Sequence, residues 1–174
     1  FMGNTRGFRG GYASSRHGIS VSPIALSPDK PDDMQRDYWY TSMRDAAELA
    51  PPEAVGRYAA ERALSRLAAR KLRTREVPVL FESTLASGLV GAYVQATSGG
   101  SLYRKSSFLE GCLGQPVMAS HLDLHEFPHL RKGKGSAPFD DEGVTTHARR
   151  VVDGGVAQGY FLSSYSARKL GMKT

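Results

Sequence analysis

The chain has 174 residues, of which 40% are hydrophobic and 23% are charged. These proportions are typical of one globular domain with its own core, and they exclude a wholly disordered chain. The longest uncharged run, residues 83–103, contains too many polar and glycine residues for a membrane span.

The net charge is +6, which suits an anionic partner but is modest for a nucleic-acid-binding protein of this length. A single cysteine, Cys112, excludes an internal disulfide framework and favours a reducing, cytoplasmic location. We expect Cys112 to be a small semi-buried residue rather than a catalytic thiol, because no oriented histidine partner can be identified for it. The chain starts at Phe1-Met2 and stops after a segment that looks ordered, which suggests a fragment of a longer protein.

Residues 1–50 are predicted to form an antiparallel β-meander of three runs, centred on residues 8–12, 19–26 and 34–43. The loop between the second and third runs, residues 27–33, carries two prolines and three aspartates, which is typical turn chemistry. The third run has polar and aromatic side chains on both faces. It is therefore predicted to border a groove or an interface.

Residues 51–110 are predicted to form a helix, a strand and a second helix. Pro51, Pro52 and Glu53 suit the first turn of a helix. Its apolar face repeats every 3.6 residues, and the members of that face are Val55, Ala59, Ala60, Ala63, Leu64, Leu67 and Ala68. Another face carries Arg62, Arg66 and Arg70, which form either a surface for nucleic acid or an acidic partner, or a solvated face whose side-chain stems cover apolar surface.

Residues 77–82 are predicted to be a short buried strand, followed by a helix over 83–98 that Ser83 or Thr84 caps and Gly99-Gly100 ends. This helix is built largely from small residues. Glycine costs roughly 1 kcal/mol relative to alanine inside a helix, so Gly88 and Gly91 imply close packing or cavity space. Residues 111–174 are predicted to contain loops and a β-hairpin that turns at residues 153–155. The fold class is α+β, with two main helices packed on an antiparallel or mixed sheet.

His125, Glu126 and His129 match the H-E-x-x-H pattern of zinc proteases. That mechanism needs a helix, because only a helix places both imidazoles on one face. Pro128 opposes a helix here, since its ring clashes with the preceding turn. A surface loop with incidental histidines is therefore the preferred interpretation, and a self-sufficient zinc protease is an alternative.

Several segments together resemble the TldD/PmbA family, once described as modulators of DNA gyrase, and within it the PmbA (TldE) branch. The order and spacing of these segments fit the family from end to end of the chain. They are residues 34–40, 98–100, 103–108, 138–143 and 160–171. The resemblance covers the middle of the family's polypeptide, so the family's N-terminal domain and the end of its C-terminal domain are expected to lie outside these 174 residues.

The resemblance implies a bacterial or archaeal metalloprotease system in the cytoplasm, in which a TldD-like subunit pairs with a PmbA-like subunit. Such a pair acts on unfolded or short peptides, as in microcin maturation and antitoxin degradation. In the metal-bearing subunit an H-E-x-x-x-H motif precedes an Arg-Lys pair. Aligned by its distance from Arg104-Lys105, that motif falls on Gly91, Ala92 and Ala96. None of these can ligate a metal, so the resemblance implies a metal-free subunit with no catalytic residue or cofactor of its own, and zinc in the partner.

The residues expected to contact peptide are Tyr103, Arg104, Tyr165 and Arg168, because Arg and Tyr donors suit peptide carbonyls and carboxylates. The alternative is that these four side chains merely tie loops to the sheet. The expected partners are a TldD-like subunit and a peptide, with a homodimer of the isolated chain as a further possibility. A nucleic-acid-binding regulator that uses the arginine face is the alternative function, and no membrane association is expected.

Overall fold

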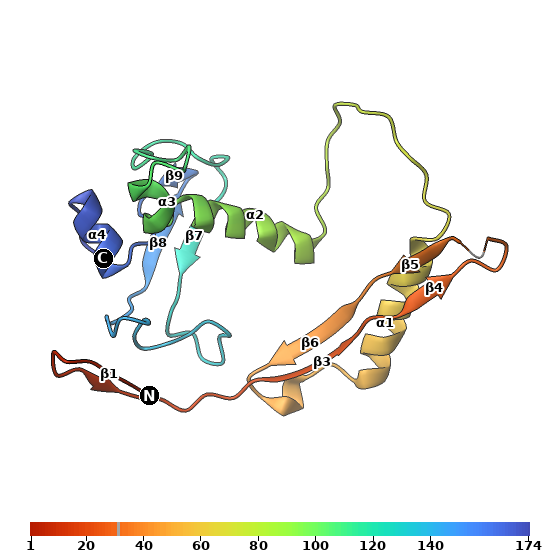
Figure 1. Cartoon of the computed structure of the whole chain (residues 1–174), viewed down its shortest axis with the longest axis horizontal. Helices are drawn as coiled ribbons and strands as arrows, with labels where there is room; N and C mark the ends of the chain where they lie inside the picture. Colours follow the sequence, from red (N-terminus) through yellow and green to blue (C-terminus); the bar gives the residue numbers. More distant parts are fainter. Residues whose placement is uncertain (31) are drawn as a thin grey trace. The chain divides into compact units, whose positions relative to one another are not determined.

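The computed structural model describes residues 1–30 and 32–174, and it confirms an α+β fold of helices and short antiparallel strands (Figure 1). The chain forms two compact units. Unit 1 contains residues 1, 11–76 and 131–134, and unit 2 contains residues 2–10, 77–130 and 135–174. Among the described helices, none has the length and apolar character that crossing a membrane requires.

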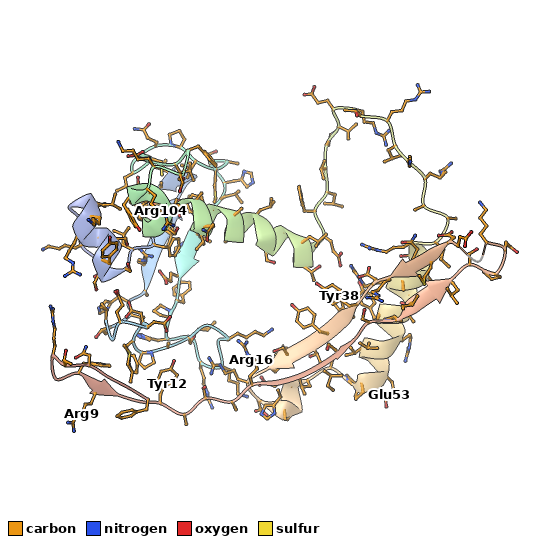
Figure 2. All side chains as sticks on the ribbon, viewed as in Figure 1. Arg9, Tyr12, Arg16, Tyr38, Glu53 and Arg104 are labelled. Atoms are coloured by element: carbon orange, nitrogen blue, oxygen red, sulfur yellow. The ribbon has the colours of Figure 1, made fainter. Side chains whose placement is uncertain are left out.

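Unit 1 is built on one long β-hairpin. Strand β3 (His17–Val21) pairs with β6 (Trp39–Met43), and β4 (Ile24–Leu26) pairs with β5 (Met34–Arg36). Because side chains alternate along a strand, every second residue faces α1, among them the buried Ala25, Asp37 and Thr41. The opposite face carries exposed apolar side chains, and Figure 2 shows Tyr38 on this side. These side chains are Ile24, Leu26, Met34, Tyr38 and Tyr40.

Helix α1 (Pro52–Ser65) packs on this hairpin as its sequence predicts. Pro52 stands at the first helical position, and the buried residues Val55, Ala59 and Ala63 recur at four-residue spacing. The apolar face is shorter than predicted, since the helix ends at Ser65 and Leu64 is 57% exposed. A 3-10 turn, η1 (Ala46–Glu48), precedes α1.

Residues 131–134 join unit 1 from far along the chain. The Lys132 ammonium lies 2.8 Å from the Asp45 carboxylate and also pairs with Glu48. The Arg44 guanidinium donates a hydrogen bond of 2.9 Å to the Lys134 carbonyl. These contacts close unit 1 with a segment that follows most of unit 2 in sequence.

Unit 2 contains a three-stranded antiparallel sheet of β7 (Leu124–Glu126), β8 (Arg149–Asp153) and β9 (Val156–Ala157). The predicted hairpin is confirmed: Gly154 and Gly155 both have positive φ, at 53° and 79°, between β8 and β9. A small hairpin of β1 (Met2–Gly3) and β2 (Arg9–Gly10) also belongs to this unit, where the Phe8 ring meets Phe139 at 5.1 Å between centroids.

Three helices complete unit 2: α2 (Ser83–Ala96), α3 (Gly99–Tyr103) and α4 (Ser164–Leu170). One buried cluster lies beneath α3, and its members are Leu102, Cys112, Ala157 and Tyr160. Cys112 is a free thiol, and it is more deeply buried than the semi-buried position predicted for it. A second cluster links α2 to β8 through Tyr93, Val151 and Val152.

Several sequence-based predictions of elements were wrong. The first 44 residues are not a three-run meander, because the first run pairs with β1 instead of β3. Residues 77–82 form no strand: they are assigned no regular structure, and Leu80 is 97% exposed. A strand needs a neighbour for its backbone hydrogen bonds, and no described segment pairs with this one.

Helix α2 also differs from its prediction. It ends at Ala96 instead of Ser98, because the Ser98 N–H bonds the Gln95 carbonyl and the Gly99 N–H bonds the Phe161 carbonyl, and Gly99-Gly100 then begins α3. Neither Ser83 nor Thr84 is the cap, since the N-cap position belongs to Glu82. A Cβ added at Gly88 or Gly91 would meet no atom within 4 Å, so the predicted close packing at these glycines is absent from the described chain.

Candidate functional site

Helices α3 and α4 begin side by side, because their N-termini are joined through the backbone. The Gly99 N–H donates to the Phe161 carbonyl at 2.7 Å, and the Phe161 N–H donates to the Thr97 carbonyl at 3.1 Å. Gly99 lies directly against Ser166 of α4, where any added Cβ would overlap the serine side chain. The absence of a side chain at Gly99 therefore permits this close approach.

The local sequence fixes the start of both helices. Ser98 caps α3 by accepting from the Ser101 N–H, and Ser163 caps α4 by accepting from the Ser166 N–H. The Ser166 hydroxyl in turn accepts a hydrogen bond of 2.9 Å from the Ser163 N–H, which completes a capping box. These caps fix the rotation of the two short helices, and therefore the direction in which their tyrosines project.

The paired helices carry a row of two rings with a cation at each end. The Tyr103 and Tyr165 rings meet edge to face, with 5.6 Å between centroids. The Arg104 guanidinium carbon lies 5.3 Å from the Tyr103 ring centroid, and the Lys169 ammonium lies 5.6 Å from the Tyr165 ring centroid. We call this row, together with Arg168, the α3–α4 patch.

The cations of the patch have no acidic partners within residues 1–30 and 32–174. Among the described residues, no ion pair involves Arg104, Arg168 or Lys169, although Arg149 and Arg150 of the same unit pair with Glu126 and Asp153. Glu142 accepts a hydrogen bond from the Ser164 N–H at 2.6 Å and therefore lies at the N-terminus of α4. Uncompensated positive charge on exposed side chains attracts anionic groups.

The backbone next to Arg104 is strained. Lys105 has a φ of 56°, in the left-handed region that favours glycine. Its N–H bonds the Leu102 carbonyl, and the Ser106 N–H bonds the Ser101 carbonyl, which is the Schellman arrangement of a helix end. The chain thus ends α3 abruptly while retaining a lysine where glycine would fit without strain.

The structure brings together three of the four residues predicted to contact peptide, Tyr103, Arg104 and Tyr165. Arg168 lies three residues after Tyr165 on the same helix, which places it one turn away. Lys169 was not among the four residues predicted to contact peptide, and α4 was not predicted as a helix. The signal was present in the Ser163–Ser166 spacing of the capping box and in the four-residue interval from Tyr165 to Lys169.

The positions aligned with the family's metal motif lie in the C-terminal half of α2. Gly91 and Ala92 are exposed and Ala96 is partly buried. None of these side chains offers a nitrogen, oxygen or sulfur atom, so the residues present at these positions do not fit a zinc ion.

The H-E-x-x-H segment has a different conformation from a zinc-protease helix. His125 and Glu126 are neighbours on strand β7, and therefore point to opposite faces, while His129 lies in a turn. Glu126 pairs with Arg149 at 2.6 Å, and the His129 ring contacts the Thr146 hydroxyl at 3.1 Å. The helical geometry that a self-sufficient zinc protease requires is absent from this segment, as Pro128 predicts. More generally, the described residues contain no group of three or more His, Cys, Asp or Glu side chains placed to hold a metal ion.

The arginine face of α1 is not a free basic surface. Arg62 and Arg66 both approach the buried Asp37 carboxylate, at 3.3 Å and 3.1 Å. Arg62 also lies over the Trp39 ring at 5.3 Å. Arg70 falls beyond the end of the helix. The row predicted as a nucleic-acid surface is therefore broken, with two of its three charges already paired.

Two family models cover almost the whole chain. The PmbA/TldA metallopeptidase central domain matches residues 1–67, and the PmbA/TldA metallopeptidase C-terminal domain matches residues 74–174. The metalloprotease PmbA of Escherichia coli O157:H7 is 47% identical over 173 residues, which cover 99% of this chain and 38% of that protein. The chain thus spans less than half the length of this relative.

Solved structures agree with the sequence comparisons. A crystal structure from Bacteroides thetaiotaomicron, named for a modulator of DNA gyrase, superposes with a TM-score of 0.89 at 29% identity, covering 97% of this chain and 38% of that one. TldE from Thermococcus kodakarensis superposes with a TM-score of 0.69 at 17% identity, covering 91% of this chain and 35% of that one. At that identity the second likeness concerns the fold alone.

Proposed function

The chain belongs to the PmbA/TldD metallopeptidase family, and from that premise we propose that it is part of the metal-free, PmbA/TldE-like subunit of a two-subunit peptidase. The observation that carries the proposal is the side-chain chemistry of α2. The positions aligned with the H-E-x-x-x-H motif are Gly91, Ala92 and Ala96, and none can ligate zinc or transfer a proton.

In this proposal the metal and the catalytic glutamate belong to a TldD-like partner, and zinc there supplies the activated water. The chain itself contributes binding surface: exposed Arg and Tyr side chains that hold an unfolded or short peptide. The 47% identity to a protein named as a metalloprotease supports the peptidase context, and the structural likeness to a TldE supports the fold of the pairing subunit.

The proposal is tested by expressing the chain alone and together with the TldD-like subunit of the same organism. We expect the isolated chain to contain far less than one zinc per molecule by elemental analysis and to leave an unfolded peptide uncleaved. The co-expressed pair should co-elute and cleave the peptide. The TldD-like subunit alone is the matched control, and we expect it to cleave more slowly than the pair.

Two results would overturn the proposal: one tightly bound zinc per isolated chain, or cleavage by the isolated chain that a chelator abolishes. A pair of variants sharpens the experiment. Ala92→Glu restores a potential general base in the C-terminal half of α2, and Gly91→His restores a potential metal ligand there. Neither is expected to give activity in the isolated chain, because the rest of a zinc site is lacking.

A further inference from the structure

We propose that the α3–α4 patch binds an acidic segment of extended peptide, with one carboxylate at each end of the tyrosine pair. This inference takes from the proposed function only the ligand class, a peptide, and its test requires neither a partner subunit nor turnover. The starting observation is the order of groups along the patch: Lys169, Tyr165, Tyr103 and then Arg104.

The charge of the patch favours an anion. Its three cations, with Lys105 beside them, form no ion pair within the described chain, and Arg104, Arg168 and Lys169 are all exposed. The Arg104 guanidinium contacts Tyr103 in two ways: it lies 5.3 Å from the ring centroid and donates a hydrogen bond of 3.4 Å to the hydroxyl. A guanidinium held by its neighbours loses less side-chain entropy when it pairs with a carboxylate, and it can form two hydrogen bonds at once.

The patch offers one cation at each end of the tyrosine pair, so it suits two carboxylates carried by the same peptide. The three steps from Lys169 to Arg104 are each shorter than 6 Å, so these cations lie no more than about 18 Å apart. An extended peptide advances about 3.3 Å per residue, and about five residues are therefore enough to bridge the patch.

The middle of the patch favours an apolar or aromatic residue. Tyr165 is 50% exposed although it packs against Tyr103. Exposed edge-to-face rings offer a surface on which a third ring can pack. The ligand that fits best is therefore an extended acidic–aromatic–acidic peptide.

The probe is a fluorescent capped pentapeptide, Glu-Gly-Phe-Gly-Glu, whose binding to the intact chain is measured by anisotropy. We expect binding that weakens at least about tenfold between 50 mM and 500 mM salt, because screening reduces attraction between exposed charges. The Gln-Gly-Phe-Gly-Gln peptide should bind at least about tenfold more weakly. The same neutral peptide with a free C-terminal carboxylate distinguishes a terminal anion from acidic side chains.

The variants locate the site. Arg104→Gln and Lys169→Gln should each weaken binding by about threefold or more, and the double variant by more than either. Tyr165→Leu tests the ring. The matched control is Arg6→Gln, which removes the same charge from an exposed position in unit 2 outside the patch and should leave binding unchanged.

Circular dichroism of each variant checks that the substitution has not disrupted the fold. Equal affinity for acidic and neutral peptides, or patch variants that behave like Arg6→Gln, would overturn the inference. The inference would also be overturned if the neutral peptide with a free C-terminus bound more tightly than the capped acidic peptide. If the patch fails while the two-subunit peptidase is active, the proposed function survives and only the peptide-binding assignment falls.

Discussion

At the scale of single residues, two buried tyrosines make the stability of the chain sensitive to alkaline pH. Burial raises the pKa of Tyr160, and its contact with the Cys112 thiol adds to this effect. Burial likewise raises the pKa of Tyr93, and nearby Cys112 and Tyr160 contribute. A neutral buried hydroxyl resists ionisation because its charged form would lose hydration.

The sign of the pH effect follows from the pH at which the folded and the unfolded chain each release the two tyrosine protons. In the unfolded chain both tyrosines ionise near their usual pKa of about 10, whereas in the folded chain they stay protonated to higher pH. Their contribution to the free energy of unfolding is therefore complete below about pH 10 and is lost as the pH rises through the folded values.

A spectrophotometric titration at 295 nm tests this expectation. Of the eight tyrosines in the chain, we expect two to ionise later than the rest in native protein and none to do so in urea. Tyr160→Phe should remove one of the late protons. A native curve that matches the denatured one would contradict the assignment.

For the candidate site, the sequence indicated which side chains take part but not how they are arranged. Tyr103, Arg104 and Tyr165 were identified by side-chain chemistry, which depends on composition alone. Their edge-to-face contact depends on Gly99 meeting Ser166 across a gap of more than 60 residues. No local pattern encodes such a meeting, so the sequence predicted the members of the site except Lys169, and not their arrangement.

At the scale of elements, glycine has opposite roles in two consecutive helices. On α2, a Cβ at Gly91 would meet nothing within 4 Å, whereas on α3 a Cβ at Gly99 would overlap Ser166. Gly91→Ala should therefore raise the free energy of unfolding by roughly 0.5–1 kcal/mol through helix propensity. Gly99→Ala should lower it by about 1–3 kcal/mol through overpacking.

Urea unfolding followed by circular dichroism at 222 nm measures both changes, and each variant controls for the other because both add one methyl group to a helix. The prediction for α2 is wrong if Gly91→Ala destabilises the chain.

Local signals predicted α1 well and residues 77–82 poorly. Proline at the first helical position and apolar residues every four positions are sufficient to define α1. A strand is different, since its stability depends on a neighbouring strand that can lie anywhere in sequence. Helix α4 was missed for a third reason: seven residues are too few to show a period, and its signal resides in its caps.

At the scale of the whole molecule, the connection between α1 and α2 is the most accessible part of the chain. Residues 69–82 have no regular structure, and nearly all of them are exposed. They include four trypsin sites, Arg70, Lys71, Arg73 and Arg75. Exposed segments without backbone hydrogen bonds are the preferred sites of proteolytic nicking.

Brief trypsin treatment should therefore cut first within residues 70–75. Arg62 serves as the internal control, because it lies within α1 beside Asp37 and should be protected. The two pieces should separate on a denaturing gel and co-elute on native gel filtration. Early cleavage at Arg62, or pieces that separate without denaturant, would contradict this prediction.

Co-elution is expected because each unit contains a segment from the other side of the cut. Residues 131–134 complete unit 1 through Lys132, and residues 2–10 complete unit 2 through Phe8. The boundary between the two family models, near residue 70, therefore differs from the boundary between the compact units.

This reciprocal exchange of segments has a consequence for synthesis. When the first 76 residues have left the ribosome, unit 1 still lacks residues 131–134, and the Asp45 and Glu48 carboxylates still lack Lys132. The long hairpin of unit 1 and α1 lack this segment while more than 50 further residues are added. Unit 1 therefore gains its last segment only after most of unit 2 has been synthesised.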